Sequence, residues 1–439
     1  MGAIKPRLSG MMFLQYAVWG FWLPILARYL QAPIAEGGLG FTPGQVGWIL
    51  GLAASSGAIT APFLAGQFAD RYFATEKFLA ALLLIGGGIL WVVSFQTTFT
   101  AWLVLSVLYS IVYQPTIALT NSLAFSHIKD PDKEFPLIRV WGTIGWIAAS
   151  WIFPWVVLQT NLQFQSLPPF LVGDEVADST AKIVHAMKWS GTVSMLYAVY
   201  CLFLPHTPPK RDNVESLAFA KAFALMKHPS FALLVAASLP ISVIHQIYFV
   251  QTAPFLGEAL GLKNSHIGPA MSIGQFAEIG VLALLPLMLK SLGFRATICI
   301  GGMAYFLRYA IFGTVGLPVA AIVSSQALHG FCFACFFATA FIYVDRIAPA
   351  DVRNSAQTVF GIIILGLGPI ISAPTLTFLS GQFQDADGVM NYSGLWYSLA
   401  GVALFTTVIF GLFWRDETNG PDENAGHDAK AEATAETSP

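Results

Sequence analysis

The sequence predicts an all-α polytopic membrane protein with twelve transmembrane helices in two six-helix halves. Three observations predict this class. Of the 439 residues, 56% are hydrophobic and only 10% are charged, whereas a soluble globular protein carries about 25% charged residues. Twelve apolar stretches are each long enough to cross a bilayer as a helix. A polar segment, residues 207–228, separates the first six stretches from the last six.

A hydropathy window of about 20 residues places the individual spans. We expect them at 8–30, 45–67, 78–96, 99–124, 136–158, 189–206, 229–256, 264–290, 295–315, 318–344, 354–381 and 392–414. The chain then divides into an N-terminal half (1–206), a cytoplasmic central loop (207–228), a C-terminal half (229–414) and a tail (415–439). The tail lacks hydrophobic residues, so we expect it to be disordered. In the long loop 159–188 we expect a short helix.

The distribution of Lys and Arg predicts the orientation in the membrane. With both termini inside, sixteen of the 22 basic residues fall on cytoplasmic segments and four on outer segments. Arg139 and Arg308 remain inside spans. Because cytoplasmic loops are enriched in Lys and Arg, we expect both termini to face the cytoplasm.

Arg139 lies inside the fifth span, where a charged side chain costs about 3 kcal/mol or more unless it faces protein or a water-filled cavity. Thr143 and Trp146 follow at i+4 and i+7, so a cation, a hydroxyl and a large aromatic share one face of the helix. This face is one half of a candidate pocket for a polar solute with a flat ring.

Gln275 and Glu278, in the eighth span, supply the complementary half of the pocket. Glu278 is the only carboxylate well inside any expected span. A carboxylate in a cavity that alternately hydrates and dries can take up and release a proton, which couples solute movement to a proton gradient. The alternative is a structural ion pair between Glu278 and either Arg139 or Arg308.

Four further residues are polar or aromatic at mid-membrane positions. The amide of Gln246 is costly in lipid and should face the interior, and Phe333 is the aromatic residue that we place near a ring-shaped ligand. His245 is either a proton relay or a core histidine, with the core histidine favoured. For Arg308 we favour a structural role over substrate contact.

The sequence offers no pattern typical of an enzyme or of a metal site. Paired catalytic carboxylates, histidines at metal-ligand spacing and a Ser/His set near one membrane face are all missing. Cys332 and Cys335 form a C-x-x-C within an apolar run without a histidine partner, so we interpret them as packing residues. We expect no metal and no cofactor other than protons as the coupling ion.

Six plus six helices around a charged central loop is the layout of the major facilitator superfamily. The segment 66–77 (GQFADRYFATEK) resembles its signature G-x-x-x-D-R-x-x-x-R-[RK], with Gly66, Asp70 and Arg71 in place and Glu76 instead of a later basic residue. The resemblance implies that these residues help to hold one access state closed. Arg353 and its neighbour Arg346 look like the corresponding latch of the second half.

Six segments together resemble the nucleoside:proton symporter family of that superfamily. They are 14–23 (LQYAVWGFWL), 113–116 (YQPT), 138–145 (IRVWGTIG), 275–278 (QFAE), 307–312 (LRYAIF) and 352–357 (VRNSAQ). The resemblance implies proton-coupled nucleoside import across a bacterial inner membrane, by a protein that we expect to be a monomer and to bind no nucleic acid. It assigns substrate binding by position to Arg139, Thr143, Trp146, Gln246, Gln275, Glu278 and Phe333.

Two positions depart from the better-known enteric members of the family. Ala334 stands where they carry an aspartate, and Phe249 stands where they carry an asparagine. The loss of two polar contacts leaves the base preference open and makes Glu278 the sole intramembrane acid for proton coupling. A carrier for a sugar or another small polar solute remains the alternative.

Overall fold

The structure, a computed structural model, describes most of the chain. The described residues are 4–69, 72–166, 168–209, 223–349, 352–385 and 388–417. The predicted disordered tail from 418 on and most of the predicted central loop lie outside them.

The N-terminal half is helical except for one hairpin. Its elements are α1 (Ile4–Gly20), α2 (Leu26–Gln31), η1 (Ile34–Glu36), α3 (Pro43–Ala61), η2 (Pro62–Ala69), α5 (Thr75–Val93), α6 (Phe99–Ser126), α7 (Pro131–Phe153), η3 (Pro154–Leu158), β1 (Gln159–Phe164), β2 (Leu171–Glu175), α8 (Ser179–Lys182) and α9 (His185–Cys201).

The C-terminal half repeats the helical pattern. Its elements are η4 (Leu225–Lys227), α11 (Pro229–Pro254), η5 (Phe255–Ala259), α12 (Asn264–Gly313), α13 (Val319–Ser324), η6 (Ser325–Ala327), α14 (Leu328–Phe331), η7 (Cys332–Ala338), α15 (Thr339–Ile347), α16 (Arg353–Gly361), η8 (Ile362–Leu367), α17 (Gly368–Phe383) and α18 (Tyr392–Phe413).

Eleven of the twelve expected spans correspond to a helix or to a continuous run of helical segments, and the first is covered by α1 and α2 with a turn at 21–25 between them. Within the described residues, nine helices are long and apolar enough to cross a membrane. The 50-residue α12 holds two of the expected spans, because Gly293 breaks it with φ 74° and ψ 176°. The first and sixth expected spans correspond to shorter helices, because α1 and α9 are each only 17 residues long. The predicted fold class is therefore confirmed.

Local sequence explains where several helices begin. Thr42 caps α3 by accepting a hydrogen bond from the Gln45 amide at 3.2 Å, while the Gln45 side chain accepts one from the Thr42 amide at 2.9 Å. Proline occupies the first helical position of α3 and α7, where its missing N–H costs nothing. Asp130 caps α7 through the backbone amide of Lys133.

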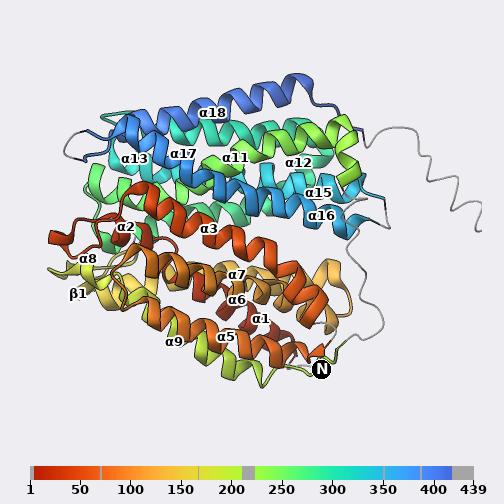
Figure 1. Cartoon of the computed structure of the whole chain (residues 1–439), viewed down its shortest axis with the longest axis horizontal. Coiled ribbons are helices and arrows are strands. Elements are labelled where there is room, and N and C mark those ends of the chain that lie inside the picture. Colours follow the sequence, from red (N-terminus) through yellow and green to blue (C-terminus); the bar gives the residue numbers. More distant parts are fainter. Residues whose placement is uncertain are drawn as a thin grey trace, which may run out of the picture.

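The helices of both halves run roughly parallel to one long direction (Figure 1). α1 begins and α18 ends at one end of the molecule, which we call the proximal end. The opposite end carries α2, β1 and α8, and we call it the distal end (Figure 1). The two halves lie side by side along this direction.

The loop 159–188 contains more structure than a short helix. α8 is the expected helix, but β1 and β2 form an antiparallel hairpin that the sequence analysis did not predict. Its register pairs Gln159 with Glu175 and Phe164 with Leu171.

The two halves meet closely along α3 and α17. A Cβ on Gly51 would overlap the carbonyl oxygen of Pro369, so only glycine permits this approach. One turn later, the Ser55 hydroxyl donates to the carbonyl oxygen of Gly366 at 2.5 Å. Small residues and backbone acceptors therefore hold this seam together.

A second seam joins α7 to α12. The indole N–H of Trp151 donates to the Ser272 hydroxyl at 2.7 Å. A Cβ on Gly268 would lie 2.6 Å from the carbonyl oxygen of Ser150. This packing places α7, which carries Arg139, against α12, which carries Glu278.

Candidate functional site

Arg139 is placed by α7 and is stacked on a ring from α1. The carbon of its guanidinium group lies 4.1 Å from the centroid of the Tyr16 ring, a cation–π contact. A Cβ on the intervening Gly142 would lie 2.6 Å from Tyr16 and 2.9 Å from Nη1 of Arg139. Glycine at this position therefore gives the guanidinium and the ring the space to stack.

Trp146, on the same face of α7, is buried with only 7% of its surface exposed. It forms a small cluster with Ile147 and Trp151, against which Tyr16 of α1 and Ile279 of α12 pack. Ile279 follows Glu278 directly on α12, so the cluster lies at the same level of that helix as the carboxylate.

Glu278 lies within electrostatic reach of both Arg139 and Tyr16. In the described part of the chain, however, no ion pair of 4.0 Å or less joins Glu278 to Arg139 or to Arg308. The structural ion pair considered as an alternative is thus not formed in this conformation. The carboxylate and the guanidinium therefore interact electrostatically without a direct contact.

The other α12 residue of the site, Gln275, has an unusual environment. Its side-chain oxygen is buried, and no described residue hydrogen-bonds to it. A buried acceptor without a partner costs about 1–3 kcal/mol, so this amide has a binding capacity that the protein itself does not use.

α11 and η7 contribute the aromatic side of the site. The rings of His245 and Phe249 lie 5.1 Å apart, those of His245 and Phe337 lie 5.2 Å apart, and Phe333 follows at 6.5 Å from Phe337. Phe333 keeps 36% of its surface exposed. We call these four rings together with Tyr248 the aromatic wall, and Gln246 lies beside it on α11.

His245 is tied into the wall by a hydrogen bond from a neighbouring helix. Its Nδ1 lies 2.7 Å from the Tyr305 hydroxyl of α12. The ring is half-buried rather than sealed.

Arg308 is completely buried behind the aromatic wall. Its guanidinium carbon lies 4.0 Å from the centroid of Tyr248 and 5.1 Å from that of Tyr309. Its Nη1 lies 2.8 Å from Nδ1 of His329. Aromatic faces and an imidazole thus surround this cation, and it is not part of the surface formed by Arg139 and Glu278.

Sequence reasoning missed Tyr16. The signal was available, because Tyr16 adjoins Gln15 in the segment 14–23, but no single-helix pattern shows which residue of α1 faces α7. The side-chain nitrogen of Gln15 donates to Thr116 Oγ1 at 2.7 Å, whereas no described residue hydrogen-bonds to its buried side-chain oxygen. Tyr16 contacts Arg139 directly, and this contact is what the sequence analysis did not foresee.

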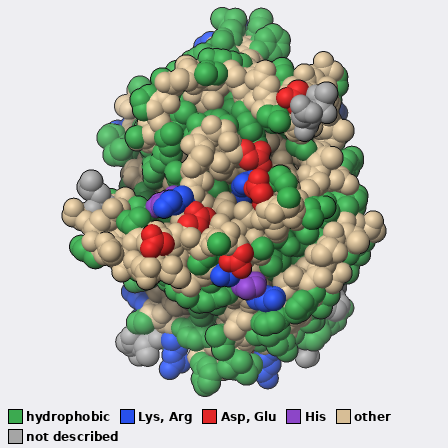
Figure 2. Space-filling model, turned by 90° about the vertical axis from the view of Figure 1, so that its left-hand side faces the viewer, with side chains coloured by type: hydrophobic (Ala, Val, Ile, Leu, Met, Phe, Trp, Pro, Cys, Tyr) green, Lys and Arg blue, Asp and Glu red, His purple; other side chains and the backbone are tan. Residues whose placement is uncertain are grey.

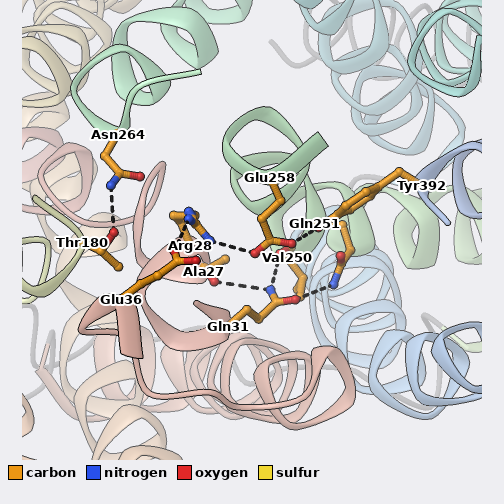
Figure 3. Close-up of polar contacts among 10 residues, drawn as sticks. All are labelled: Ala27, Arg28, Gln31, Glu36, Thr180, Val250, Gln251, Glu258, Asn264 and Tyr392. Carbon is orange, nitrogen blue, oxygen red and sulfur yellow. Dashed lines mark hydrogen bonds and ion pairs between the residues drawn. The ribbon is translucent and has the colours of Figure 1, made fainter. Parts of the chain in front are cut away.

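The distal end is closed by polar contacts between the halves (Figure 3). Arg28 of α2 donates to Glu258 of η5 at 2.7 Å and, within its own half, to Glu36 at 3.0 Å. Gln31 donates to the carbonyl oxygen of Val250 at 2.9 Å and accepts from Gln251 at 3.1 Å.

A second group of contacts lies beside the first. The backbone N–H of Asn264 donates to Glu175 at 3.0 Å, and its side-chain amide donates to Ser179 at 2.9 Å and to Thr180 at 3.0 Å. Tyr392 adds a hydrogen bond to Glu258 at 2.9 Å. We call the cross-half contacts of Arg28, Gln31 and Asn264 the distal lock.

Charged side chains gather near the middle of the distal face, with apolar side chains around them (Figure 2). The contacts of the lock join the two halves at this end of the molecule.

The residues of the superfamily signature are only partly described. Gly66 lies in η2, and Asp70 and Arg71 lie outside the described residues. Arg353 begins α16, is exposed, and lines a proximal cavity together with Arg346 and others.

Glu76, the departure from the signature, has a clear structural role. It accepts hydrogen bonds from the backbone N–H of Thr207 at 3.0 Å and pairs with Nδ1 of His206 at 2.8 Å. It thereby attaches the segment after α9 to the start of α5.

Among the described residues, no group of three or more His, Cys, Asp or Glu side chains could hold a metal ion. Cys332 and Cys335 are both buried and free.

Comparison with known proteins agrees with this geometry. The family model described as nucleoside H+ symporter matches residues 2–419. The chain is 31% identical to YegT of Escherichia coli (strain K12), covering 94% of each chain. It is 28% identical to the xanthosine permease of the same organism, covering 97% of this chain and 99% of that one.

Two solved structures show the same fold. The crystal structure of the nucleoside transporter NupG matches with a TM-score of 0.78 at 22% identity, covering 93% of this chain and 98% of that one. The D-xylose-proton symporter matches with a TM-score of 0.68 at 14% identity, covering 95% and 98%.

Proposed function

The chain belongs to the nucleoside H+ symporter family and imports nucleosides together with protons, and we propose that Arg139, Gln275 and Glu278 form the centre of its transport site. One observation carries this proposal. Arg139 of α7 and Glu278 of α12 lie within electrostatic reach of each other, and no ion pair joins them among the described residues. On the same helix as Glu278, the buried side-chain oxygen of Gln275 has no partner among the described residues. A site with unused charge and hydrogen-bonding capacity is suited to a polar substrate.

The chemistry of a nucleoside fits these residues. Ribose hydroxyls can donate to the Glu278 carboxylate and to the Gln275 oxygen, and Arg139 and Thr143 can donate to oxygen atoms of the substrate. The flat base can stack on the aromatic wall, where Phe333 is exposed. Gln246 and Trp146 complete the set of residues proposed to bind.

Glu278 is the proposed proton-coupling group. A carboxylate that loses and regains hydration as the halves rock can bind a proton on one side and release it on the other. Arg139 stays charged throughout and provides the fixed countercharge. No resident cofactor is needed for this cycle, and we place the chain among carriers rather than enzymes.

We propose that the distal end faces the outside of a bacterial inner membrane and that both termini are cytoplasmic. The basic residues support this orientation, because cytoplasmic segments are enriched in Lys and Arg. The structure would then represent a state closed to the outside by the distal lock. We propose that a single chain forms the transport unit.

Uptake measurements test the proposal. Labelled uridine and adenosine are supplied to cells that lack their own nucleoside carriers, with and without a protonophore. We expect uptake that the protonophore abolishes. Absence of uptake of both nucleosides, with the protein present in the membrane, would contradict nucleoside transport and favour a sugar or another polar solute.

Glu278→Gln tests the coupling role. The amide keeps the shape of the carboxyl group but cannot exchange a proton, so we expect loss of accumulation against a gradient while nucleoside exchange persists. Glu134→Gln is the matched control, because Glu134 pairs with Lys5 near the start of α7. Concentrative uptake by Glu278→Gln at the wild-type level would exclude Glu278 as the coupling group.

A further inference from the structure

A cavity at the proximal end is lined by three basic side chains. Its volume is about 750 Å³, and Lys290 of α12, Arg346 of α15 and Arg353 of α16 are among its lining residues. Sites for small molecules commonly have volumes of about 300–1,000 Å³. None of the residues proposed for the transport site lines this cavity, so it is a separate feature of the C-terminal half.

The cavity lies at the level where helices leave the hydrocarbon region. Lys290 is the last residue of the eighth expected span, and Arg353 directly precedes the eleventh. Arg346 lies in the last turn of α15. Both α15 and α16 lie toward the proximal end (Figure 1). In a bilayer, the headgroup region begins where the hydrocarbon core ends, so the cavity lies at the depth of the lipid phosphates.

The three basic side chains keep their hydrogen-bonding capacity. All three residues are exposed, and none of them forms an ion pair of 4.0 Å or less within the described part of the chain. Arg295, by contrast, is used by the protein itself, because its Nε donates to the carbonyl oxygen of Gly411 at 2.8 Å. An ammonium group has three N–H donors and a guanidinium group has five. The cavity therefore offers several charged donors to a ligand.

Arg346 is positioned by a ring of α12. Its guanidinium carbon lies 5.7 Å from the centroid of the Phe294 ring, and Phe294 is buried. Both residues line the cavity. A guanidinium group that already lies against a fixed ring loses less conformational freedom when it binds a ligand.

Two carboxylates also line the cavity. Asp345 accepts a hydrogen bond from Nε2 of Gln357 at 3.4 Å, and Asp416 follows the end of α18. The three basic residues supply three positive charges and the two carboxylates two negative ones, which leaves a net charge of +1. A phosphodiester, with its single negative charge, matches this value. A phosphate monoester carries about −1.5 to −2 at pH 7 and matches it less well.

Apolar side chains are exposed beside these cations. Leu289 and Ile342 line the cavity itself, and Ile342 is exposed. Leu287 and Leu292, on either side of Lys290 along α12, are exposed as well. A water-soluble phosphate would leave these side chains uncovered, whereas the glycerol and acyl chains of a lipid would cover them.

We propose that Lys290, Arg346 and Arg353 bind the phosphate group of an anionic phospholipid in the leaflet at the proximal end. Free phosphate and nucleotides carry the same group, but the charge of the cavity and its apolar surroundings favour the lipid. Basic pockets between transmembrane helices are typical sites for anionic headgroups. In the proposed orientation this leaflet is the cytoplasmic one. The inference does not depend on which solute the protein transports.

Native mass spectrometry of the full chain in detergent tests the proposal. Delipidated protein is titrated with phosphatidylglycerol or with phosphatidylethanolamine of the same acyl chains, and the Kd of the first bound lipid is measured. The cavity variant carries Lys290→Gln, Arg346→Gln and Arg353→Gln. Each single variant is measured beside it, so that the test stands if gel filtration shows that the triple variant is not folded.

A matched variant controls for the loss of three positive charges. Lys77→Gln, Lys129→Gln and Lys227→Gln change three exposed lysines on predicted cytoplasmic segments, and none of these lysines lines the cavity. The control variant has the same formal net charge as the cavity variant. A difference between the two therefore reports on the cavity and not on the overall charge of the protein.

We expect the wild type to bind phosphatidylglycerol about tenfold more tightly than phosphatidylethanolamine. A basic residue near an anionic lipid contributes about fivefold in affinity, and the two carboxylates offset part of the three contributions. The cavity variant should bind both lipids equally, each single variant should show a reduced preference, and the control variant should keep the preference of the wild type. Added inorganic phosphate should leave phosphatidylglycerol bound.

Three results would overturn the proposal. Equal affinity of the wild type for the two lipids would show that the cavity does not select an anionic headgroup. Equal losses in the cavity variant and the control variant would show that overall charge attracts the lipid. Displacement of phosphatidylglycerol from the wild type by inorganic phosphate would identify a free phosphate, and not a lipid, as the ligand of the cavity.

Discussion

Replacement of Glu258 by glutamine should open the distal end. Glu258 accepts from Arg28 across the two halves at 2.7 Å, and the Arg28 side chain is only 9% exposed. The amide of the variant keeps the shape of the side chain but loses the charge. The contact joins the two halves, so opening of the distal end would break it, and its loss would destabilise closure and not an outward-open state.

The size of the effect follows from the exposure of the two partners. A hydrogen bond to a charged group contributes about 1.5–3 kcal/mol, whereas an exposed ion pair contributes about 0.2–1 kcal/mol. Glu258 is 37% exposed, so solvent screening brings the value toward the lower figures. We expect about 1.4 kcal/mol, which corresponds to a tenfold shift in the ratio of open to closed molecules.

Spin labels at the distal end measure that ratio directly. Ile34→Cys on η1 and Val389→Cys before α18 are exposed positions on opposite halves, in a background from which the four native cysteines have been removed. Double electron–electron resonance should show that the population of molecules with a longer distance between the labels is larger in Glu258→Gln than in the wild type. The closed population of the wild type gives the reference distance.

Glu36→Gln is the matched control. Glu36 binds the same Arg28 at 3.0 Å but belongs to the same half, so its loss should change the ratio by about twofold or less. Equal shifts in the two variants would refute the assignment of Glu258 to the lock. Loss of either contact of Arg28 would then have the same effect, whether or not the contact joins the two halves. The absence of any shift in Glu258→Gln would refute it as well.

Two further substitutions test the seam and the site. Gly51→Ala should also shift the spin-label distances toward the open distal end, because its Cβ overlaps the carbonyl oxygen of Pro369 and overpacking costs about 1–3 kcal/mol; an unchanged distance distribution would contradict the tight seam. Tyr16→Leu should raise KM for nucleosides about fivefold or more, because a desolvated cation–π contact of about 1–2 kcal/mol with Arg139 is lost. Tyr16→Phe retains the ring and should change KM less than Tyr16→Leu; equal effects of the two would show that the ring is not the supporting element.

The fold could be predicted because mean hydropathy and the distribution of basic residues are properties of whole segments. The boundary between the eighth and ninth spans, for example, was expected between 290 and 295, and Gly293 breaks the helix there. The hairpin formed by β1 and β2 could not be predicted in this way. Its residues are mostly exposed, and its pairing joins positions that a hydropathy window averages together.

The candidate site could be predicted only one helix at a time. Helical spacing grouped Arg139, Thr143 and Trp146, because i, i+4 and i+7 share a face in any helix. It could not show that Tyr16 supports Arg139, since that contact depends on how α1 packs against α7. Nor could it separate the environments of the two intramembrane arginines, which depend on three other helices.

The nature of the distal lock has a consequence for transport. A carrier must leave each closed state as readily as it enters it, so contacts that close one end must be strong in sum but individually replaceable by water. The lock meets this condition because it consists of hydrogen bonds between polar groups, such as that between the buried Arg28 and the partly exposed Glu258. An apolar seal of equal area would expose hydrocarbon on opening, whereas polar partners regain their hydration. For this reason the tight glycine seam of α3 and α17 can coexist with a distal end that opens.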